Sequence, residues 1–461
     1  MPLRVLELFA GVGGFRLGLE GVKDAQGRPA FEVVCSNQWE PETPTVQHAA
    51  YIYKAQWNLQ PSELGDDVFV GKNGSELFFQ RDIKNLHAKE IPDHDVLAAG
   101  FPCQDYSVAK GSRGKGIEGK KGVLWWEILR IVKAKKPKHL ILENVDRLLR
   151  SPVVQRGRDM AIMLATLDEC GYAVEWREIN AAEYGFPQRR NRVFLLAHKK
   201  GTPQYKAIAA PSFQPTDWLT QSGTFARGFP VQPVLDVELV ATVLNSEKNL
   251  EKLSEKFNQN DDGKARSPFL GAGIMVNNRF WTMALMPVSP ETRDHLKDVL
   301  NPPSKIPDEF IVTAKDVVKA RGWLHHKGAK KQKRKDPKTN HEYNYNEGGM
   351  HFPDRVDAPA RTIITSEGGR TPTRTKHIIP FWPTPTQRRQ LDLHSAACDD
   401  VRVRVGLKPN EWLRRLVPEE LERLNGFPPG HTGGKTANQR AYLMGNALVV
   451  GIVSIIGRQL T

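Results

Sequence analysis

The chain has 461 residues, enough for one large domain and a smaller one at a typical domain size of about 100–200 residues. With 39% hydrophobic and 26% charged residues, the composition is that of a globular protein and excludes bulk disorder. The formal net charge of +14 favours a polyanionic partner such as nucleic acid over a merely soluble basic protein.

Residues 1–198 show short apolar runs that alternate with helical patterns. The runs lie at 5–9, 31–35, 96–99, 139–142 and 193–197, and helical spacing occurs at 124–132 and 160–170. This alternation predicts an α/β fold with a mostly parallel sheet covered on both faces. Ligands of such sheets bind beyond the carboxyl ends of the strands, so we expect the site in the loops that follow these runs.

The pattern of apolar and charged residues changes after residue 200. Between 200 and 356 the periodicity weakens, and a basic run spans residues 325–338. We interpret this stretch as a second, irregular domain, and we favour phosphate contact for the basic run over a solvated loop. Apolar patterning returns after 357, with helical spacing that ends at Gly426 and a buried element at 445–456. The latter is shorter than the ~20 residues of a membrane helix, and no secretory signal is recognisable.

A glycine-rich turn follows the first predicted strand. Phe9, Gly11, Gly13 and Gly14 lie between that strand and a helix, where glycine permits positive φ and a close approach of backbone N–H groups to a ligand. The spacing FxGxGG differs from the dinucleotide-binding GxGxxG, which disfavours a nicotinamide-dependent oxidoreductase. The alternative is a tight turn that binds nothing.

Polar and aromatic residues follow the next two predicted strands. Gln38 stands where nucleoside-binding sheets usually place a carboxylate for the ribose, and Trp39 can stack on adenine or simply pack in the core. Asp82, followed by Ile83, can accept from an adenine amino group.

Reactive side chains lie at the ends of three predicted strands: a thiol, a carboxyl group and two guanidinium groups. Cys103 comes directly after the run at 96–99, Glu143 after the run at 139–142, and Arg190 and Arg192 just before the run at 193–197. Taken singly, these residues fit an inert buried cysteine, a solvated carboxylate and a structural salt bridge. Together at one sheet edge they predict an active site in which Cys103 is the nucleophile.

Six motifs occur in one order: FAGVGGF (9–15), GFPCQDYS (100–107), ENV (143–145), QRRNR (188–192), RLVPEE (415–420) with LNGFP (424–428), and GNA (445–447). In this order and spacing they resemble the bacterial C5-cytosine-specific DNA methyltransferase family. The resemblance implies an S-adenosylmethionine-dependent, Rossmann-like catalytic domain at 1–198, a smaller target-recognition domain at 199–356, and C-terminal motifs at 357–461 that return to complete the catalytic domain.

The resemblance also implies roles for individual residues. Cys103 would add to carbon 6 of cytosine, Glu143 would be protonated and hydrogen-bond ring nitrogen 3, Arg192 would bind the exocyclic oxygen, and Arg190 would support the thiolate. Residues 110–121 have the composition of a lid that closes over a flipped-out base. The residues implied to bind S-adenosylmethionine are Phe9, Gly11, Gly13, Gly14, Gln38, Trp39, Asp82, Ile83, Leu124, Asn446 and Ala447.

This chain departs from the family pattern at Gln38, Tyr106 and Ala447, and Glu40 is a candidate substitute for the missing charge at 38. The expected partner is double-stranded DNA, with cognate restriction or phage-defence components as further candidates and with neither membrane nor metal. We expect a bacterial cytoplasmic, nucleoid-associated protein. Two alternatives stay open: an RNA C5-cytosine methyltransferase, which the long 200–356 insert disfavours, and a catalytically silent DNA-binding regulator, which Cys103, Glu143 and Arg192 disfavour.

Overall fold

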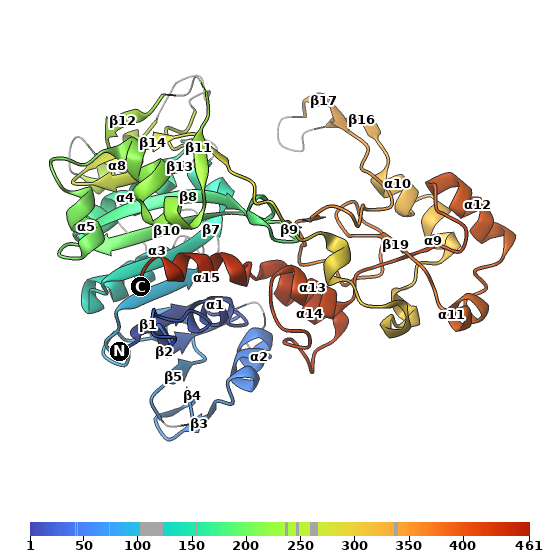
Figure 1. Ribbon diagram of the computed structural model, residues 1–461, viewed down its shortest axis with the longest axis horizontal. Helices are drawn as coiled ribbons and strands as arrows, with labels where there is room; N and C mark the ends of the chain where they lie inside the picture. Colours follow the sequence, from blue (N-terminus) through green and yellow to red (C-terminus); the bar gives the residue numbers. More distant parts are fainter. Residues whose placement is uncertain are drawn as a thin grey trace. The chain divides into compact units, whose positions relative to one another are not determined.

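The computed structural model describes residues 1–461 except positions 42, 44, 73, 102–122, 153–154, 236–237, 246–248, 259–265 and 336–339. The described chain forms two compact units, whose helices and strands are labelled in Figure 1. Unit 1 comprises Met1–Tyr184, Arg190–Glu291 and Leu448–Thr461. Unit 2 comprises Gly185–Arg189 and Thr292–Ala447.

Within the described residues, unit 1 contains a 12-stranded sheet of order β12-β14-β13-β8-β10-β7-β6-β1-β2-β5-β4-β3. The neighbours from β7 to β5 are paired in parallel, and their apolar runs are buried on both faces. The α/β prediction is confirmed in this central part. The parallel strands are β1 (Leu3–Leu8), β2 (Phe31–Asn37), β5 (Leu77–Phe79), β6 (Val96–Gly100) and β7 (His139–Val145).

The flanks of the sheet are antiparallel, so its parallel character is confined to the centre. Because β10 runs against β7, the first residues of β10 lie at the edge where β6 and β7 end: Arg192 pairs with Val145, and Gly100 pairs with Glu143. The flanking strands are β3 (Gln60–Ser62), β4 (Gly65–Val70), β8 (Tyr172–Asn180), β10 (Asn191–Lys199), β12 (Val240–Val243), β13 (Ala272–Val276) and β14 (Arg279–Met283).

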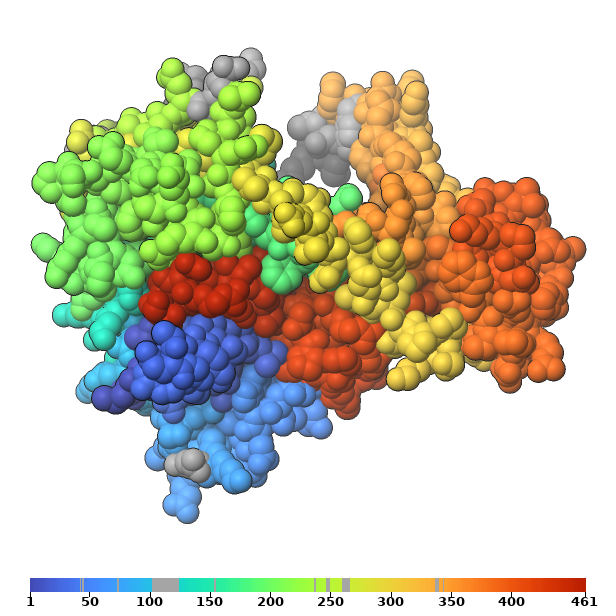
Figure 2. Space-filling model, in the orientation of Figure 1, coloured from blue at the N-terminus to red at the C-terminus, as the bar shows by residue number. Residues whose placement is uncertain are grey.

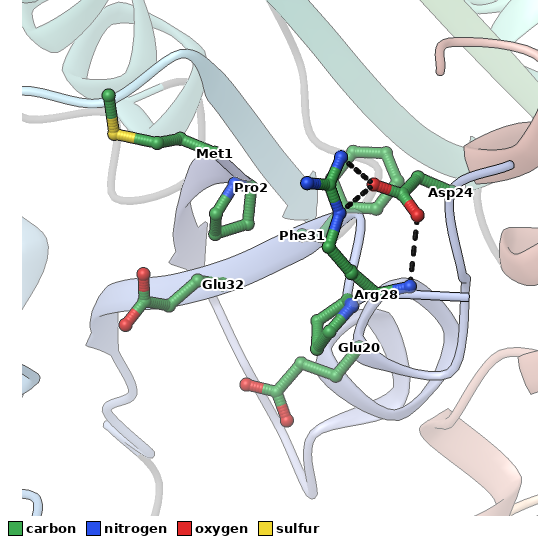
Figure 3. Close-up of a pocket in the computed structure, with 8 residues that line it drawn as sticks. Met1, Pro2, Glu20, Asp24, Arg28, Phe31 and Glu32 are labelled. Atoms are coloured by element: carbon green, nitrogen blue, oxygen red, sulfur yellow. Dashed lines mark hydrogen bonds and ion pairs between the residues drawn. The ribbon is translucent and has the colours of Figure 1, made fainter. Parts of the chain in front are cut away.

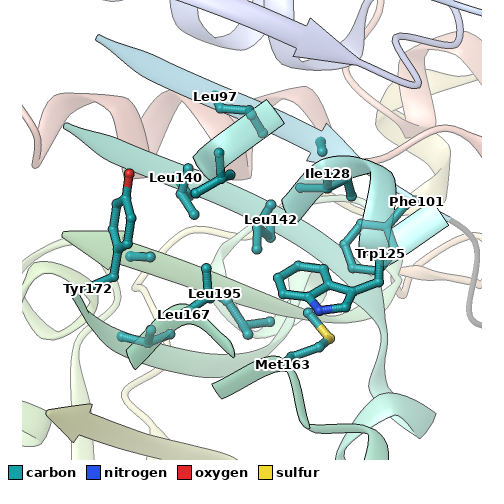
Figure 4. Packing of buried hydrophobic residues seen from close by; sticks show 14 of the residues in the cluster. Leu97, Phe101, Trp125, Ile128, Leu140, Leu142, Met163, Leu167, Tyr172 and Leu195 are labelled. Carbon is teal, nitrogen blue, oxygen red and sulfur yellow. The ribbon is translucent and has the colours of Figure 1, made fainter. Parts of the chain in front are cut away.

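Helices α3 (Val123–Lys135) and α4 (Arg158–Glu169) bury their apolar sides in one large core with alternate residues of the central strands (Figure 4). Trp125 of α3 donates its indole N–H to the Thr166 hydroxyl of α4 at 3.2 Å, which satisfies a polar group inside this core. Unit 1 also contains α2 (His48–Gln56) and the short 3₁₀ helices η1 (Ile83–Asn85), η2 (Asp146–Arg150) and η3 (Ala181–Tyr184).

Two helices far apart in the sequence pack together in unit 1 (Figure 1): α1 (Gly14–Glu20) and α15 (Val450–Arg458). A Cβ atom at Gly18 would lie 2.6 Å from Cβ of Val453, so only glycine permits this approach. The Ser454 hydroxyl donates to the Gly18 carbonyl at 2.9 Å. Residues Leu448–Thr461 therefore belong to unit 1 through α15, whereas the motifs at 415–447 lie in unit 2.

The two units are divided differently from the segments assigned from sequence. Residues 199–291 fall in unit 1, because β13 pairs with β8 and extends the main sheet. A Cβ at Gly273 would lie 2.0 Å from the Trp176 ring, which shows how closely the added strand packs. The other elements of this stretch are α5 (Pro203–Ile208), α6 (Pro215–Asp217), η4 (Trp218–Ser222), α7 (Thr224–Gly228), β11 (Val231–Pro233), α8 (Leu250–Lys256) and β15 (Leu285–Pro287).

Unit 2 has its own core, in which Trp323 and Trp412 are about 1% and 0% exposed. A buried ion pair between Arg414 and Glu420, at 2.7 Å, connects two of its elements. The elements are η5 (Leu296–Val299), η6 (Pro303–Lys305), η7 (Asp308–Phe310), α9 (Ala314–Val318), α10 (Trp323–Lys327), β16 (Lys330–Lys335), β17 (Glu342–Glu347), β9 (Gln188–Arg189), β18 (Ala360–Arg361), β19 (Ile379–Phe381), α11 (Pro385–Gln390), α12 (Ala396–Val405), β20 (Trp412–Arg414), α13 (Pro418–Leu424) and α14 (Ala437–Asn446).

One stretch of the described chain, Ala437–Arg458, has the length and hydropathy of a membrane-crossing helix, with 56% of its most apolar window buried. Core helices of water-soluble folds pass the same test, and α15 uses its apolar residues to pack against α1 and α7.

Candidate active site

The glycine turn after β1 has the strained backbone that its sequence predicts. Phe9, Gly11 and Gly13 have φ values of 54°, 56° and 83°. A Cβ at Gly13 would lie 2.0 Å from the ring of Trp57, so a side chain there has no room. The Gly11 N–H donates to Oε1 of Gln38 at 2.8 Å, which fixes the turn to the end of β2.

The side-chain oxygen of Gln38 therefore accepts a hydrogen bond from within the protein. The side-chain nitrogen of the same amide can still act as a donor. Trp39, the next residue, is half-buried. Glu40 was the candidate substitute for the missing charge at 38. In the structure, Oε2 of Glu40 accepts from the Ala49 N–H at 2.8 Å and so caps the first turn of α2.

The remaining expected nucleoside-binding residues of unit 1 lie nearby in the fold. Asp82 is the N-cap of η1 and accepts from the Lys84 N–H at 3.0 Å. Ile83 is 2% exposed and belongs to the main core. Leu124, near the start of α3, is half-buried and packs against the same core.

Asn446 and Ala447 lie at the end of unit 2, where α14 ends. The Ala447 N–H donates to the Leu443 carbonyl at 3.0 Å. A Cβ at the preceding Gly445 would lie 2.3 Å from the backbone nitrogen of Thr365, so this motif is packed against another loop of its own unit.

A buried polar network lies directly beneath the glycine turn, and sequence analysis missed it. Glu7 of β1 is fully buried; Oε2 of Glu7 accepts from the Tyr53 hydroxyl at 2.9 Å, and Oε1 accepts from the Arg16 N–H at 3.3 Å. Arg16 also pairs with Glu76. Burial raises the pKa of Glu7 to about 8 against the weaker opposing effects of Tyr53 and Arg16. The signal available in the sequence was an acid inside an apolar strand.

Replacing Glu7 with glutamine should change the pH dependence of folding stability. The wild-type folded protein keeps a proton on Glu7 that the unfolded chain releases near pH 4.5, so wild-type stability should decline between about pH 4.5 and 8. Each pH unit in this window corresponds to roughly 1 kcal/mol. Urea unfolding of both proteins at several pH values measures the difference; a difference independent of pH would contradict the buried protonated carboxyl.

The edge of the sheet where β6 and β7 end and β10 begins, called the reaction edge below, brings a carboxylate and a guanidinium together. Nε of Arg192 lies 2.8 Å from Oε1 of Glu143, and both side chains are mostly buried. Gly100 lies beside them, since a Cβ there would be 3.6 Å from Oε2 of Glu143. Sequence analysis expected this neighbourhood from the strand ends alone.

Cys103, and with it Tyr106 and the predicted lid at 110–121, lies outside the described residues. The residues on either side of that segment are well anchored. Phe101 is 3% exposed, its ring centroid lies 6.0 Å from that of Trp125, and its carbonyl accepts from the Asn144 side chain at 2.9 Å. Phe101, two positions before Cys103 in the sequence, is thus held in the core next to the strand that carries Glu143.

Arg190 is buried at 2% exposure, and its carbonyl accepts from the Ala181 N–H at 3.1 Å. Burial, and then the positive charge of Arg192, lower its pKa to about 9, and Glu143 acts in the opposite direction. The charges of Arg192 and Glu143 therefore both act on Arg190, in opposite directions.

A hollow of about 670 Å³ in unit 1 lies elsewhere (Figure 3). Its lining includes Met1 and Pro2, before β1, and Glu20 at the end of α1, and so belongs to the opposite end of β1 from the glycine turn. This hollow takes no part in the chemistry of the Glu143–Arg192 edge. In the described part of the chain, no cluster of three or more His, Cys, Asp or Glu residues is arranged to hold a metal ion.

Comparison with known proteins defines the class to which this fold and this site belong. The chain belongs to the C-5 cytosine-specific DNA methylase family, whose model matches residues 3–461. It is therefore a DNA (cytosine-5-)-methyltransferase, and the resemblance found in the sequence is confirmed.

Among its relatives, the Type II methyltransferase M.Sau3AI of Staphylococcus aureus is 37% identical over 99% of this chain and 95% of that protein. M.HhaI of Haemophilus parahaemolyticus is 33% identical over 43% of this chain and 49% of its own length. The solved structure of a Spodoptera frugiperda DNMT2 mutant superposes with a TM-score of 0.55 at 13% identity over 99% of both chains, a likeness of fold.

Proposed function

We propose that this enzyme methylates carbon 5 of a flipped-out cytosine in double-stranded DNA, with S-adenosylmethionine as the methyl donor and Cys103 as the nucleophile. The observation that carries the proposal is the Glu143–Arg192 pair at 2.8 Å, with Glu143 beside Gly100. Gly100 is the last residue of β6 and precedes Cys103 by three positions in the sequence. The methyl donor would supply an electrophilic methyl group on a sulfonium.

The residues of the glycine turn fit this donor. Gly11 and Gly13 leave the turn without side-chain bulk at these two positions, and the half-buried Trp39 would stack on adenine. The proposed cofactor residues of unit 1 also include Gly14, Gln38, Asp82, Ile83 and Leu124, and those of unit 2 are Asn446 and Ala447.

The chemistry follows from the low reactivity of cytosine. The Cys103 thiolate would bond to carbon 6, while Glu143, protonated, would hydrogen-bond ring nitrogen 3 and offset the charge that develops there. Arg192 would hold the exocyclic oxygen, and Arg190 would favour the thiolate over the thiol. Carbon 5 would then bond to the methyl group, whose bond to the donor's sulfur would break and leave a neutral thioether. Loss of the carbon 5 proton to a base, and of Cys103 from carbon 6, would restore the aromatic ring. The target must leave the duplex first, which costs a few kcal/mol of stacking.

The Type II names of the relatives support a restriction-modification setting in the bacterial cytoplasm, near the nucleoid, with a cognate nuclease or phage-defence component as partner. Expression of the protein in a methylation-free host, followed by bisulfite sequencing of the host DNA, tests the proposal. We expect 5-methylcytosine at one short sequence. Methyl incorporation into transfer RNA but not DNA would favour the RNA alternative, and none into either would favour a silent regulator.

A further inference from the structure

Unit 2 carries an exposed β-hairpin that sequence analysis treated only as a basic run. Strands β16 and β17 pair antiparallel and extend from the rest of the unit (Figures 1 and 2). In register, Lys331 faces Asn346 and Lys333 faces Asn344. Because side chains alternate between the faces of a strand, the hairpin has two different faces.

One face is occupied by internal contacts. The Arg334 guanidinium lies 3.6 Å from the centroid of the Tyr345 ring, and Lys330 lies 3.7 Å from Glu347. The Tyr345 hydroxyl donates to Glu347 at 3.2 Å. This face therefore stabilises the hairpin itself.

The other face is directed to solvent. Lys331, Lys333, Asn344 and Asn346 are all exposed, and among the described residues neither lysine forms an ion pair. The same face carries Lys335 and, opposite it, Glu342 at the end farther from the body of the unit. The two Lys–Asn pairs thus form a Lys/Asn face of two cations and two neutral amides whose hydrogen-bonding groups face outward.

The base of the hairpin is held in place. Nε of Arg374 pairs with Glu347 at 3.0 Å, and the same guanidinium donates to the carbonyls of Gly328 and Gly348, on either side of the hairpin. The Met350 N–H donates to the Lys327 carbonyl at 2.8 Å. The hairpin therefore presents its Lys/Asn face from a fixed base.

We infer that the Lys/Asn face enters the major groove of the DNA substrate, with Asn344 and Asn346 reading base edges and Lys331 and Lys333 on the flanking phosphates. The inference rests on the proposed methylation of DNA. A two-stranded ribbon fits a groove about 12 Å wide, and the carboxamide of asparagine matches the N6/N7 edge of adenine. Asn344 and Asn346 are two residues apart on a strand, about 6.8 Å, which is two steps of the base stack.

The alternative is that the whole hairpin contacts only phosphates, as the sequence analysis favoured for the basic run. Lysines suffice for that purpose, because neutralised phosphates release counterions. Neutral asparagines add nothing to counterion release, and their placement opposite the lysines on one exposed face is what favours base reading.

Three variants distinguish base recognition by the hairpin from contact with phosphates alone. N344A/N346A removes the amides, K331A/K333A removes the charges, and Gln332→Ala removes an exposed amide from the opposite face as the matched control. Each protein is tested for binding to a randomised DNA pool over a salt series, and for the set of sites it methylates in a methylation-free host. K315A/K408A, two exposed lysines elsewhere in unit 2, controls for charge.

N344A/N346A should discriminate about ten- to a hundredfold less between target and near-target DNA, with new sites methylated and an unchanged salt slope. K331A/K333A should weaken binding to all sequences and reduce the salt slope by about 2. Neither control should do either. The inference is overturned if N344A/N346A keeps the wild-type discrimination, or if Gln332→Ala relaxes it equally.

Thermal unfolding of each variant checks the hairpin, and the single changes Asn344→Ser and Asn346→Ser repeat the test if the double variant unfolds early. A wild type that binds one sequence in the pool but methylates nothing would count against the proposed catalysis while the binding discrimination still decides the role of the hairpin.

Discussion

Replacing Cys103 with alanine is expected to reduce methyl transfer to DNA by at least about a thousandfold. Without the thiolate no bond forms at carbon 6 of cytosine, so carbon 5 does not become nucleophilic enough to accept the methyl group. Incorporation of labelled methyl groups into DNA that contains the target measures the loss. DNA binding should persist, since the phosphate contacts do not involve the thiol.

The matched control is Cys170→Ala, which removes a half-buried thiol at the end of α4 and should leave turnover within a few-fold of wild type. DNA with 5-fluorocytosine at the target adds a direct test, because fluorine cannot leave as a cation and the adduct persists. Wild-type enzyme should remain joined to this DNA after denaturation and Cys103→Ala should not. Release of active wild-type enzyme from the fluorinated target would contradict covalent catalysis by Cys103.

Replacing Glu143 with glutamine is expected to lower kcat by about 10²- to 10⁴-fold with little change in KM for DNA. Glutamine keeps the shape and can hydrogen-bond ring nitrogen 3, but it cannot share a proton with it. The substitution also removes the carboxylate that lies 2.8 Å from Nε of Arg192. Steady-state methyl transfer at varied DNA concentration separates the two constants.

Glu127→Gln serves as the control, because the ion pair that Glu127 forms among the described residues is a local one with Arg130 on the same helix, α3, and such pairs contribute little. A second comparison is Arg192→Lys, which keeps the positive charge but not the planar group and should lose activity by a smaller factor than Arg192→Ala. If Glu143→Gln retained kcat within about threefold, Glu143 would have no part in activating the ring.

The reaction edge was predictable because its residues follow strands that are apolar on both faces. Runs such as residues 96–99 and 139–142 leave few alternatives to buried parallel strands, and parallel strands end at a common edge. The proximity of Glu143 to Arg192 followed from that, although β10 runs antiparallel. The network around Glu7 did not follow, since its partner Tyr53 is 46 positions away and no local pattern connects them.

The division into units was beyond local patterns for a similar reason. The run at 272–276 is apolar enough for a strand, but nothing within it specifies that its partner is β8, almost 100 positions earlier. The hairpin β16–β17 was not predicted because lysine and asparagine are poor strand formers. Its pairing depends on contacts between the two strands, such as that of Arg334 with Tyr345, which no local pattern shows.

The contact of α1 with α15 has a consequence for the life of the newly made chain. Ser454, which bonds to Gly18, lies 436 positions later in the chain. The ribosome needs roughly 20–90 s to synthesise the residues between them at about 5–20 residues per second. During that interval the helix that begins at Gly14 lacks its packing partner, so the turn beside it, which we propose binds the methyl donor, stays incomplete on the ribosome. A nascent chain is therefore unable to modify the genome until its last helix has emerged.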